Sequence, residues 1–93
     1  MAQPALQDSN KPKDVQTRVS GVVDALVARR KPAAVPVGPT EILSEVGLTS
    51  LDMVNLMLGI EEEFDLFVPQ KQMVPDNFRT ISAIVALLGG LLT

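Results

Sequence analysis

The stretch from Gly47 to Asp65, GLTSLDMVNLMLGIEEEFD, constrains the fold of this chain more than any other segment. Its apolar residues recur every three or four positions, which is the spacing of a helix. Thr49 followed by Asp52 just before this run fits the capping-box pattern, with Asp in place of the usual Glu or Gln. We therefore predict a helix from Ser50 to Phe64. One of its faces carries Met53, Leu56, Met57, Ile60 and Phe64, and a second apolar stripe carries Leu51, Val54 and Leu58.

Two other segments show the same helical spacing. The first begins at Asp14 and ends before Pro32, which cannot continue a helix; its apolar face is Val15, Val19, Val22, Val23, Leu26 and Val27. The second begins after Thr80, a residue suited to capping, and its apolar face is Ile81, Ile84, Val85, Leu88, Leu91 and Leu92. No segment alternates polar and apolar residues as a half-buried strand does. The sequence therefore predicts an all-α fold.

Proline-rich connections separate these helices. The connection from Lys31 to Gly47 is long for a small domain, and we expect Ile42, Leu43 and Val46 to pin it by burial in a short helical turn. A second loop follows Pro69 and should contain one short turn near Asp76 to Phe78. Residues 1–13 are polar and predicted to be a disordered lead, which leaves 14–92 as one domain.

The composition excludes several classes of function. The 93 residues include no Cys, His, Tyr or Trp. Without Cys or His the chain lacks a thiolate nucleophile, the usual general base and the commonest metal ligands, so we expect neither an enzyme nor a metal site. A net charge of −3 argues against binding to nucleic acid or to an anionic membrane. With no membrane-spanning run and no apolar secretory segment at the N-terminus, the expectation is a cytoplasmic monomer.

Ser50 is the candidate site. If Thr49 is the N-cap, Ser50 is the first residue of the helix, where free backbone N–H groups and the helix dipole favour an anion. A phosphate-linked group on this hydroxyl would project from a rigid helix. An ordinary first-turn serine is the alternative. Likewise the Leu51, Val54 and Leu58 stripe could pack under the Lys31–Gly47 loop, and the acidic run from Glu61 could be a solvated face.

The chain resembles the acyl carrier protein family between Ile42 and Pro69. The matching residues are Ile42, Val46 and Gly47 before the serine, then Ser50-Leu51-Asp52-x-Val54, Leu56, Glu61-Glu62-Glu63-Phe64-Asp65 and Pro69. Thr80-Ile81 resembles the start of the last helix of that family. The resemblance extends more loosely over residues 14–92. It implies a small four-helix bundle with a short third helix and a long first loop.

The resemblance also implies a function. Ser50 would carry 4′-phosphopantetheine, installed by a phosphopantetheinyl transferase, and the arm would present acyl groups as thioesters to acyl-transferring or synthase enzymes of fatty-acid, lipid or polyketide-type biosynthesis. Docking to these partners would use Leu51, Asp52, Val54, Leu58, Glu61, Glu62 and Asp65. A core able to open for an acyl chain would be lined by Val23, Leu26, Ile42, Leu56, Met57, Ile60, Phe64, Ile81, Ile84 and Leu88.

Three departures from the family pattern favour a specialised carrier with few partners. Thr49 stands where the family generally has Asp, and Asn55 where it often has Glu. The loop after Gln70 is longer than is typical and carries Lys71 and Arg79 where acids are common. Two alternatives stay open at this point: a peptidyl or aminoacyl carrier, and an unmodified helical adaptor that binds protein through the apolar stripe.

Overall fold

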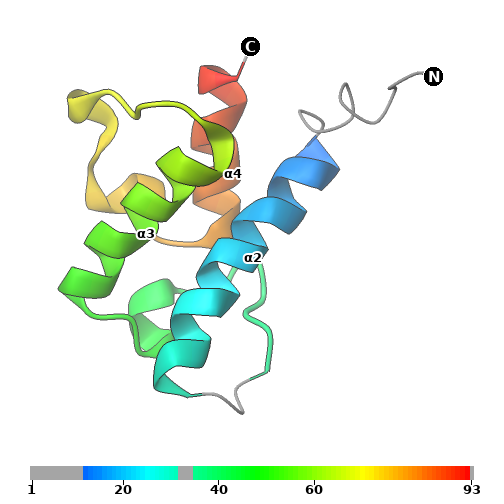
Figure 1. Cartoon of the computed structure of the whole chain (residues 1–93), viewed down its shortest axis with the longest axis vertical. Coiled ribbons are helices and arrows are strands. Elements are labelled where there is room, and N and C mark those ends of the chain that lie inside the picture. Colours follow the sequence, from blue (N-terminus) through cyan, green and yellow to red (C-terminus); the bar gives the residue numbers. More distant parts are fainter. Residues whose placement is uncertain (1–11, 32–34, 93) are drawn as a thin grey trace.

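The computed structural model describes residues 12–31 and 35–92, with side chains from Asp14 onward, and these ranges contain helices and loops but no strand (Figure 1). The α-helices are α2 (Pro12–Arg30), α3 (Ser50–Phe64) and α4 (Ile81–Leu91). Three short 3₁₀ helices lie in the loops: η1 (Leu43–Val46), η2 (Gln70–Gln72) and η3 (Pro75–Phe78). The all-α prediction is confirmed, as are the predicted bounds of α3.

The predicted four-helix bundle is not confirmed. The described residues form three α-helices, and the expected short third helix is the 3₁₀ turn η3. Only four residues separate Val74 from Arg79, and Thr80 already caps α4, so there is room for a single turn. Helix α2 begins at Pro12, two residues before the predicted start, since proline suits the first turn of a helix. The rest of the predicted disordered lead, residues 1–11, lies outside the described residues.

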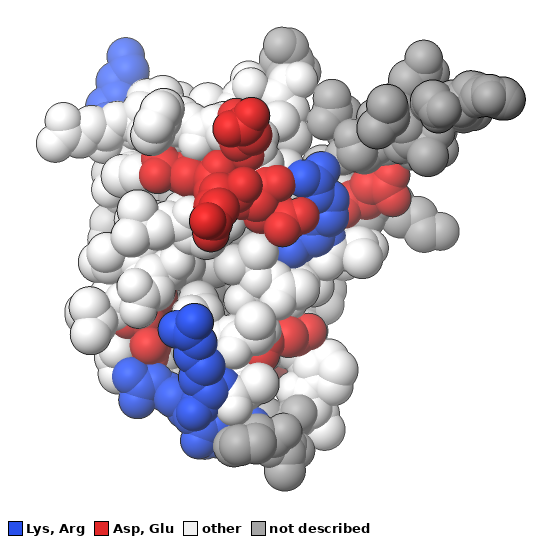
Figure 2. Space-filling model, viewed as in Figure 1, with Lys and Arg blue, Asp and Glu red and all other residues white. Residues whose placement is uncertain are grey.

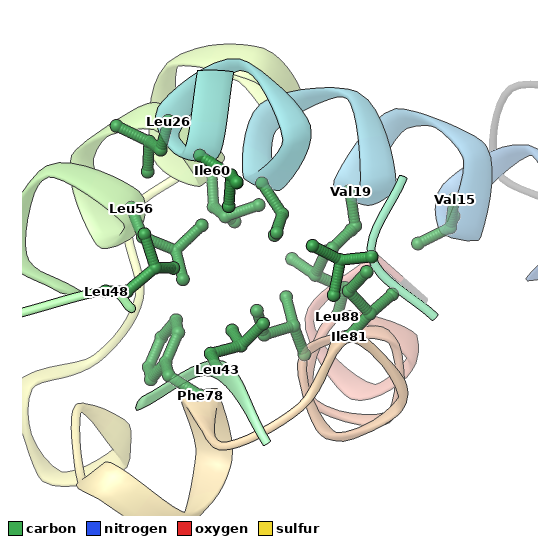
Figure 3. Close-up of a cluster of buried hydrophobic side chains, with 14 of the residues drawn as sticks. Val15, Val19, Leu26, Leu43, Leu48, Leu56, Ile60, Phe78, Ile81 and Leu88 are labelled. Carbon is green, nitrogen blue, oxygen red and sulfur yellow. The ribbon is translucent and has the colours of Figure 1, made fainter. Parts of the chain in front are cut away.

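Helix α2 is the centre of the fold, because both α3 and α4 pack against it. Its buried face meets the buried faces of the other two helices in one core, which also takes side chains from the loops (Figure 3). Phe78 from η3 and Leu43 from η1 are completely buried there. Burial of this kind stabilises α2 even though its valines and Gly21 are poor helix formers. The buried apolar residues are Val15, Val19, Val23, Leu26, Val27, Val37, Leu43, Leu48, Leu56, Ile60, Phe64, Val68, Phe78, Ile81, Ile84 and Leu88.

The long connection before α3 is held at several points, as expected. Val37 donates its backbone N–H to the Asp24 carboxylate of α2 at 3.0 Å. Near η1 the backbone N–H of Leu43 donates to the Arg79 carbonyl at 2.9 Å. These bonds tie the loop to both α2 and the start of α4. The predicted helical turn is η1, in which Leu43 is buried, while Ile42 and Val46 beside it are half-buried.

Helices α2 and α3 approach closely at Gly59. A Cβ built at Gly59 would lie 3.0 Å from Cγ1 of Val22 on α2, so a larger residue here would require the Val22 side chain to shift by a few tenths of an ångström. No helix in the described ranges is long and apolar enough to cross a membrane.

Candidate functional site

Ser50 is the first residue of α3, and a complete capping box holds it there. The Asp52 backbone N–H donates to Thr49 Oγ1 at 3.2 Å, and the Thr49 backbone N–H donates to Asp52 Oδ2 at 2.8 Å. Thr49 Oγ1 also lies 3.0 Å from Asp52 Oδ2. Threonine therefore caps this helix in place of the more usual aspartate, as the sequence predicted. Because the cap fixes the residues on both sides of it, the exposed Ser50 side chain stands on a rigid turn.

An ion pair joins this capping box to α2. Arg30 Nε lies 2.7 Å from Asp52 Oδ2, and Arg30 Nη2 donates to Asp52 Oδ1 at 3.2 Å. The pKa of Asp52 lies below its ordinary value, chiefly because the Thr49 backbone N–H donates to the carboxylate and also because Arg30 donates to it; burial opposes the shift. Asp52 is thus held as an anion between the cap and the last residue of α2.

The docking role of Asp52 stays a prediction, and the structure shows that this residue also has a structural role. The residue is only 7% exposed, and its carboxylate oxygens accept from Thr49 and Arg30. A partner enzyme would meet a carboxylate that is already paired with Arg30 and bonded to Thr49. Its helix position was predicted correctly, but the ion pair was not, because nothing in the sequence relates Arg30 to a residue 22 positions later.

Gly47 turns the chain from η1 into the capping box. Its φ of 105° lies in the left-handed region, which a residue with a side chain rarely adopts. Leu48 follows and is buried, with its backbone N–H bonded to the Leu43 carbonyl at 3.3 Å. The glycine and the buried leucine together anchor the loop immediately before Thr49. The Val46-Gly47 pattern in the sequence therefore marks a real backbone requirement.

A surface hollow of about 590 Å³ opens beside Ser50. Three methionines, Met53 and Met57 of α3 and Met73 after η2, contribute much of its apolar lining, and Arg79 and Asp76 add charge. The remaining lining residues are Ile42, Ser44, Glu45, Val54, Pro75 and Phe78. A long, flexible arm on Ser50 would start at the edge of this hollow, so the residues present fit a phosphopantetheine group. When bound, that group supplies a reactive thiol at its free end.

The second apolar stripe of α3 faces solvent. Leu51 is 67% exposed, Val54 50% and Leu58 56%. The alternative that the Lys31–Gly47 loop covers this stripe is therefore wrong for the described part of that loop. Phe67, just after α3, is still more exposed at 88%. The exposed apolar surface starts next to Ser50 and runs along α3, as a docking surface requires.

The acidic run at the end of α3 divides into structural and exposed members. Glu61 Oε2 accepts the Val68 backbone N–H at 2.8 Å and so holds the loop after α3. Glu63 is paired with Arg18 of α2 at 2.9 Å, and the Arg18 guanidinium lies 4.2 Å from the centre of the Phe64 ring. Glu62 and Asp65 are exposed. Of the four predicted acidic docking residues, these two have exposed side chains, although Asp65 also ends α3 as its C-cap.

Comparison with known proteins defines the class. The pattern of the phosphopantetheine attachment site family matches residues 22–88, a range that contains the second half of α2, all of α3, most of α4 and Ser50. The chain therefore belongs to the phosphopantetheine-attachment carrier family, whose members are carriers and not catalysts. Its prosthetic group is covalently attached 4′-phosphopantetheine.

Within that family the chain is similar to two proteins of Bradyrhizobium diazoefficiens. It is 44% identical to Aminoacyl carrier protein 1 over 71 residues, which covers 76% of this chain and 78% of that protein. Aminoacyl carrier protein 2 is 40% identical over 75 residues, covering 81% of this chain and 83% of that protein. The mitochondrial acyl carrier protein of Saccharomyces cerevisiae is 44% identical over only 46 residues, covering half of this chain and 35% of that protein.

A solved structure shares the fold. In the crystal structure of Bradyrhizobium japonicum glycine:[carrier protein] ligase complexed with its cognate carrier protein and an analogue of glycyl adenylate, one chain matches with a TM-score of 0.67 at 40% identity. The match covers 81% of this chain and 96% of that chain. A second structure of the same ligase, with glycylated carrier protein, matches with a TM-score of 0.66.

Proposed function

We propose that this protein is an aminoacyl carrier whose phosphopantetheine arm is attached to Ser50 and is loaded with an amino acid by an ATP-dependent ligase. The similarity to the two aminoacyl carrier proteins carries this proposal, since it extends over about four-fifths of the chain. The crystal structures supply a partner of the matching kind, a glycine:[carrier protein] ligase. This function is the alternative that the sequence left open beside the acyl carrier.

Ser50 is the attachment residue in this proposal because of its position. It is exposed, it begins α3, and backbone N–H groups in the first turn of a helix lack acceptors within the helix. The phosphodiester that attachment creates would lie in the favourable field of the helix N-terminus. The positions of Thr49 and Asp52 keep this turn in place without covering the serine.

A fatty-acyl carrier is the second candidate, and one observation favours it. The hollow beside Ser50 is lined by Met53, Met57 and Met73, whose flexible, apolar side chains adapt to irregular guests. A glycyl group makes little use of such an apolar surface, whereas a fatty-acyl chain would gain apolar contacts with it. The mitochondrial acyl carrier protein is similar over a shorter region, which makes this function the less favoured of the two.

Loading assays separate these functions. The protein is first incubated with coenzyme A and a broad-specificity phosphopantetheinyl transferase, and intact mass should show one added arm. The modified protein is then given ATP, glycine and the Bradyrhizobium glycine:[carrier protein] ligase or, in parallel, a fatty acid and an acyl carrier protein synthetase. Efficient glycylation with slow fatty acylation supports the proposal. Faster fatty acylation than glycylation would favour the fatty-acyl carrier. If the intact mass showed no added arm, the unmodified helical adaptor would be the remaining function.

A further inference from the structure

A groove between α2 and α3 carries opposite charges at its two ends. Arg29 of α2 lines it together with Asn55, Leu58 and Glu62 of α3. Figure 2 shows the basic side chains at the C-terminal end of α2 gathered at one end of this face, and the acidic side chains of the second half of α3 gathered across the other. Between them, Asn55 and Leu58 contribute no charge.

The basic residues at the end of α2 lie beside the loop that leads to Ser50. Arg30 binds Asp52, two residues after Ser50. Lys31 Nζ would lie 3.9 Å from a Cβ built at Gly47, which places this ammonium beside the turn that leads into the capping box. Arg29 is exposed and lines the groove. Because Arg30 is already paired with Asp52, Arg29 supplies, among the described residues, the unpaired positive charge at this end of the groove, although the chain as a whole carries −3.

The acidic end lies about three to four turns beyond Ser50 along α3. Glu62 and Asp65 are exposed there and share a second hollow with Leu58 and the exposed Phe67. Within the described part of the chain, neither Arg29 nor Glu62 belongs to an ion pair, although they line the same groove. Both charges are consequently available to a partner.

Cations at the end of α2 also have a simple structural explanation. Lys and Arg in the last turn of a helix interact favourably with the helix dipole. That effect accounts for cations anywhere around the last turn. The dipole does not explain why Arg29 lines the groove beside the exposed Leu51, Val54 and Leu58 stripe of α3. The two explanations predict different consequences for a change at Arg29, namely a loss of stability or a loss of binding.

We infer that the α2/α3 groove is a two-pole docking surface for the enzyme that loads the arm. Acidic side chains of that enzyme contact Arg29, while its basic side chains contact Glu62 and Asp65. Leu51, Val54 and Leu58 provide the apolar contact beside the groove. The inference rests on the proposed function and adds to it the positive pole at the attachment site.

Opposite charges at the two ends of the groove favour one orientation of the docked partner, whereas a uniformly acidic helix would not distinguish between orientations. A partner that docked the other way round would face like charges at both ends, and such contacts are unfavourable. The correct direction places Ser50 at the basic pole, against the acidic part of the partner surface. Charges at the rim of an interface act mainly on association rate and are screened by salt, with a Debye length of about 8 Å at physiological ionic strength.

The experiment compares charge variants of the phosphopantetheine-bearing protein in binding to the Bradyrhizobium glycine:[carrier protein] ligase. Arg29→Glu and Glu62→Lys each reverse one pole, and the double variant swaps the poles while the net charge stays at −3. Lys71→Glu is the matched control, because Lys71 is an exposed cation in η2 that lines neither the groove nor the hollow beside Phe67. Kd and association rate are measured at low and high salt, and thermal unfolding of each variant checks the fold.

Each single reversal should raise Kd about fivefold at low salt, and the double variant should be weakest, at about 25-fold, with the differences shrinking at high salt. Lys71→Glu should bind as the unchanged protein does. Recovery of binding in the double variant would show that only net charge matters, and would overturn the inference. Unchanged binding of Arg29→Glu with a lowered melting temperature would assign Arg29 to the helix dipole alone. Failure of the unchanged protein to bind or be glycylated would instead overturn the proposed function, and the inference with it.

Discussion

Arg30 Nε lies 2.7 Å from Asp52 Oδ2, so the last residue of α2 is bonded to the capping box that starts α3. Asp52 oxygens accept from the backbone and side chain of Thr49 as well. One carboxylate therefore joins two helices and fixes the turn on which Ser50 stands.

Loss of the ion pair should loosen the attachment turn. Arg30→Gln removes the charged donor while Asp52 stays buried, so we expect the melting temperature to fall by about 4–8 °C. Thermal unfolding followed by circular dichroism measures this. Arg29→Gln is the control, because Arg29 is exposed and forms no ion pair within the described residues; it should change the melting temperature by less than about 2 °C.

Stability should fall in acid because of Asp52. Its pKa is lowered in the folded protein by the Thr49 N–H and by Arg30, so ionised Asp52 stabilises the fold above its unfolded pKa. That contribution disappears as pH falls below about 4 and through the lower, folded-state pKa. Asp52→Asn should therefore flatten the acid side of a stability-against-pH profile. Asp76→Asn, at an exposed position, should keep the slope of the unchanged protein.

Ser50 should be the sole site of modification. Ser50→Ala should fold normally, since the side chain is exposed and the cap is made by Thr49 and Asp52, yet it should accept no phosphopantetheine. Ser44→Ala should be modified at the normal rate, although Ser44 lines the same hollow. Intact mass after incubation with coenzyme A and the transferase measures both. An added arm on Ser50→Ala would contradict the assignment.

Glu61 and Glu62 should differ although they are neighbours. The sequence predicted both as docking residues, but the Glu61 carboxylate accepts the Val68 backbone N–H at 2.8 Å. We expect Glu61→Ala to lower the free energy of unfolding by about 1 kcal/mol and Glu62→Ala to change it by less than about 0.5 kcal/mol. Chemical denaturation measures both values. Equal effects would mean that the Glu61 bond contributes nothing to the loop.

The chemical nature of the group carried on the arm should determine whether the side chains of the hydrophobic core change their environment. A fatty-acyl chain held inside would bind only the folded state and raise the melting temperature, as linkage requires. We expect an octanoyl cargo to shift the methyl resonances of the buried Ile60 and Ile84, and a glycyl cargo to leave them unchanged. If neither cargo shifts them, the acyl chain is not held in the core. A shift confined to Met53 and Met57 would place it in the surface hollow instead.

Sequence patterns over a few residues predicted much of the architecture, because helix formation and helix capping depend on interactions between residues close in sequence. Helical spacing and a capping box depend on residues three and four apart, so α3, its Thr49 cap and the Thr80 cap of α4 were all readable from the sequence. The same reasoning predicted that the chain turns briefly near Leu43 and near Phe78. It also identified the Leu51, Val54 and Leu58 stripe, but not whether that stripe was covered.

Tertiary structure decided what each polar residue does. Arg30 and Asp52 are 22 residues apart, and Arg18 and Glu63 are 45 apart, so only the packing of α3 on α2 could reveal these pairs. Packing paired Asp52 with Arg30, bonded Glu61 to the loop after α3, and left Glu62 exposed in the same groove as Arg29. Position along one helix follows from sequence alone, but partners across two helices depend on how those helices meet.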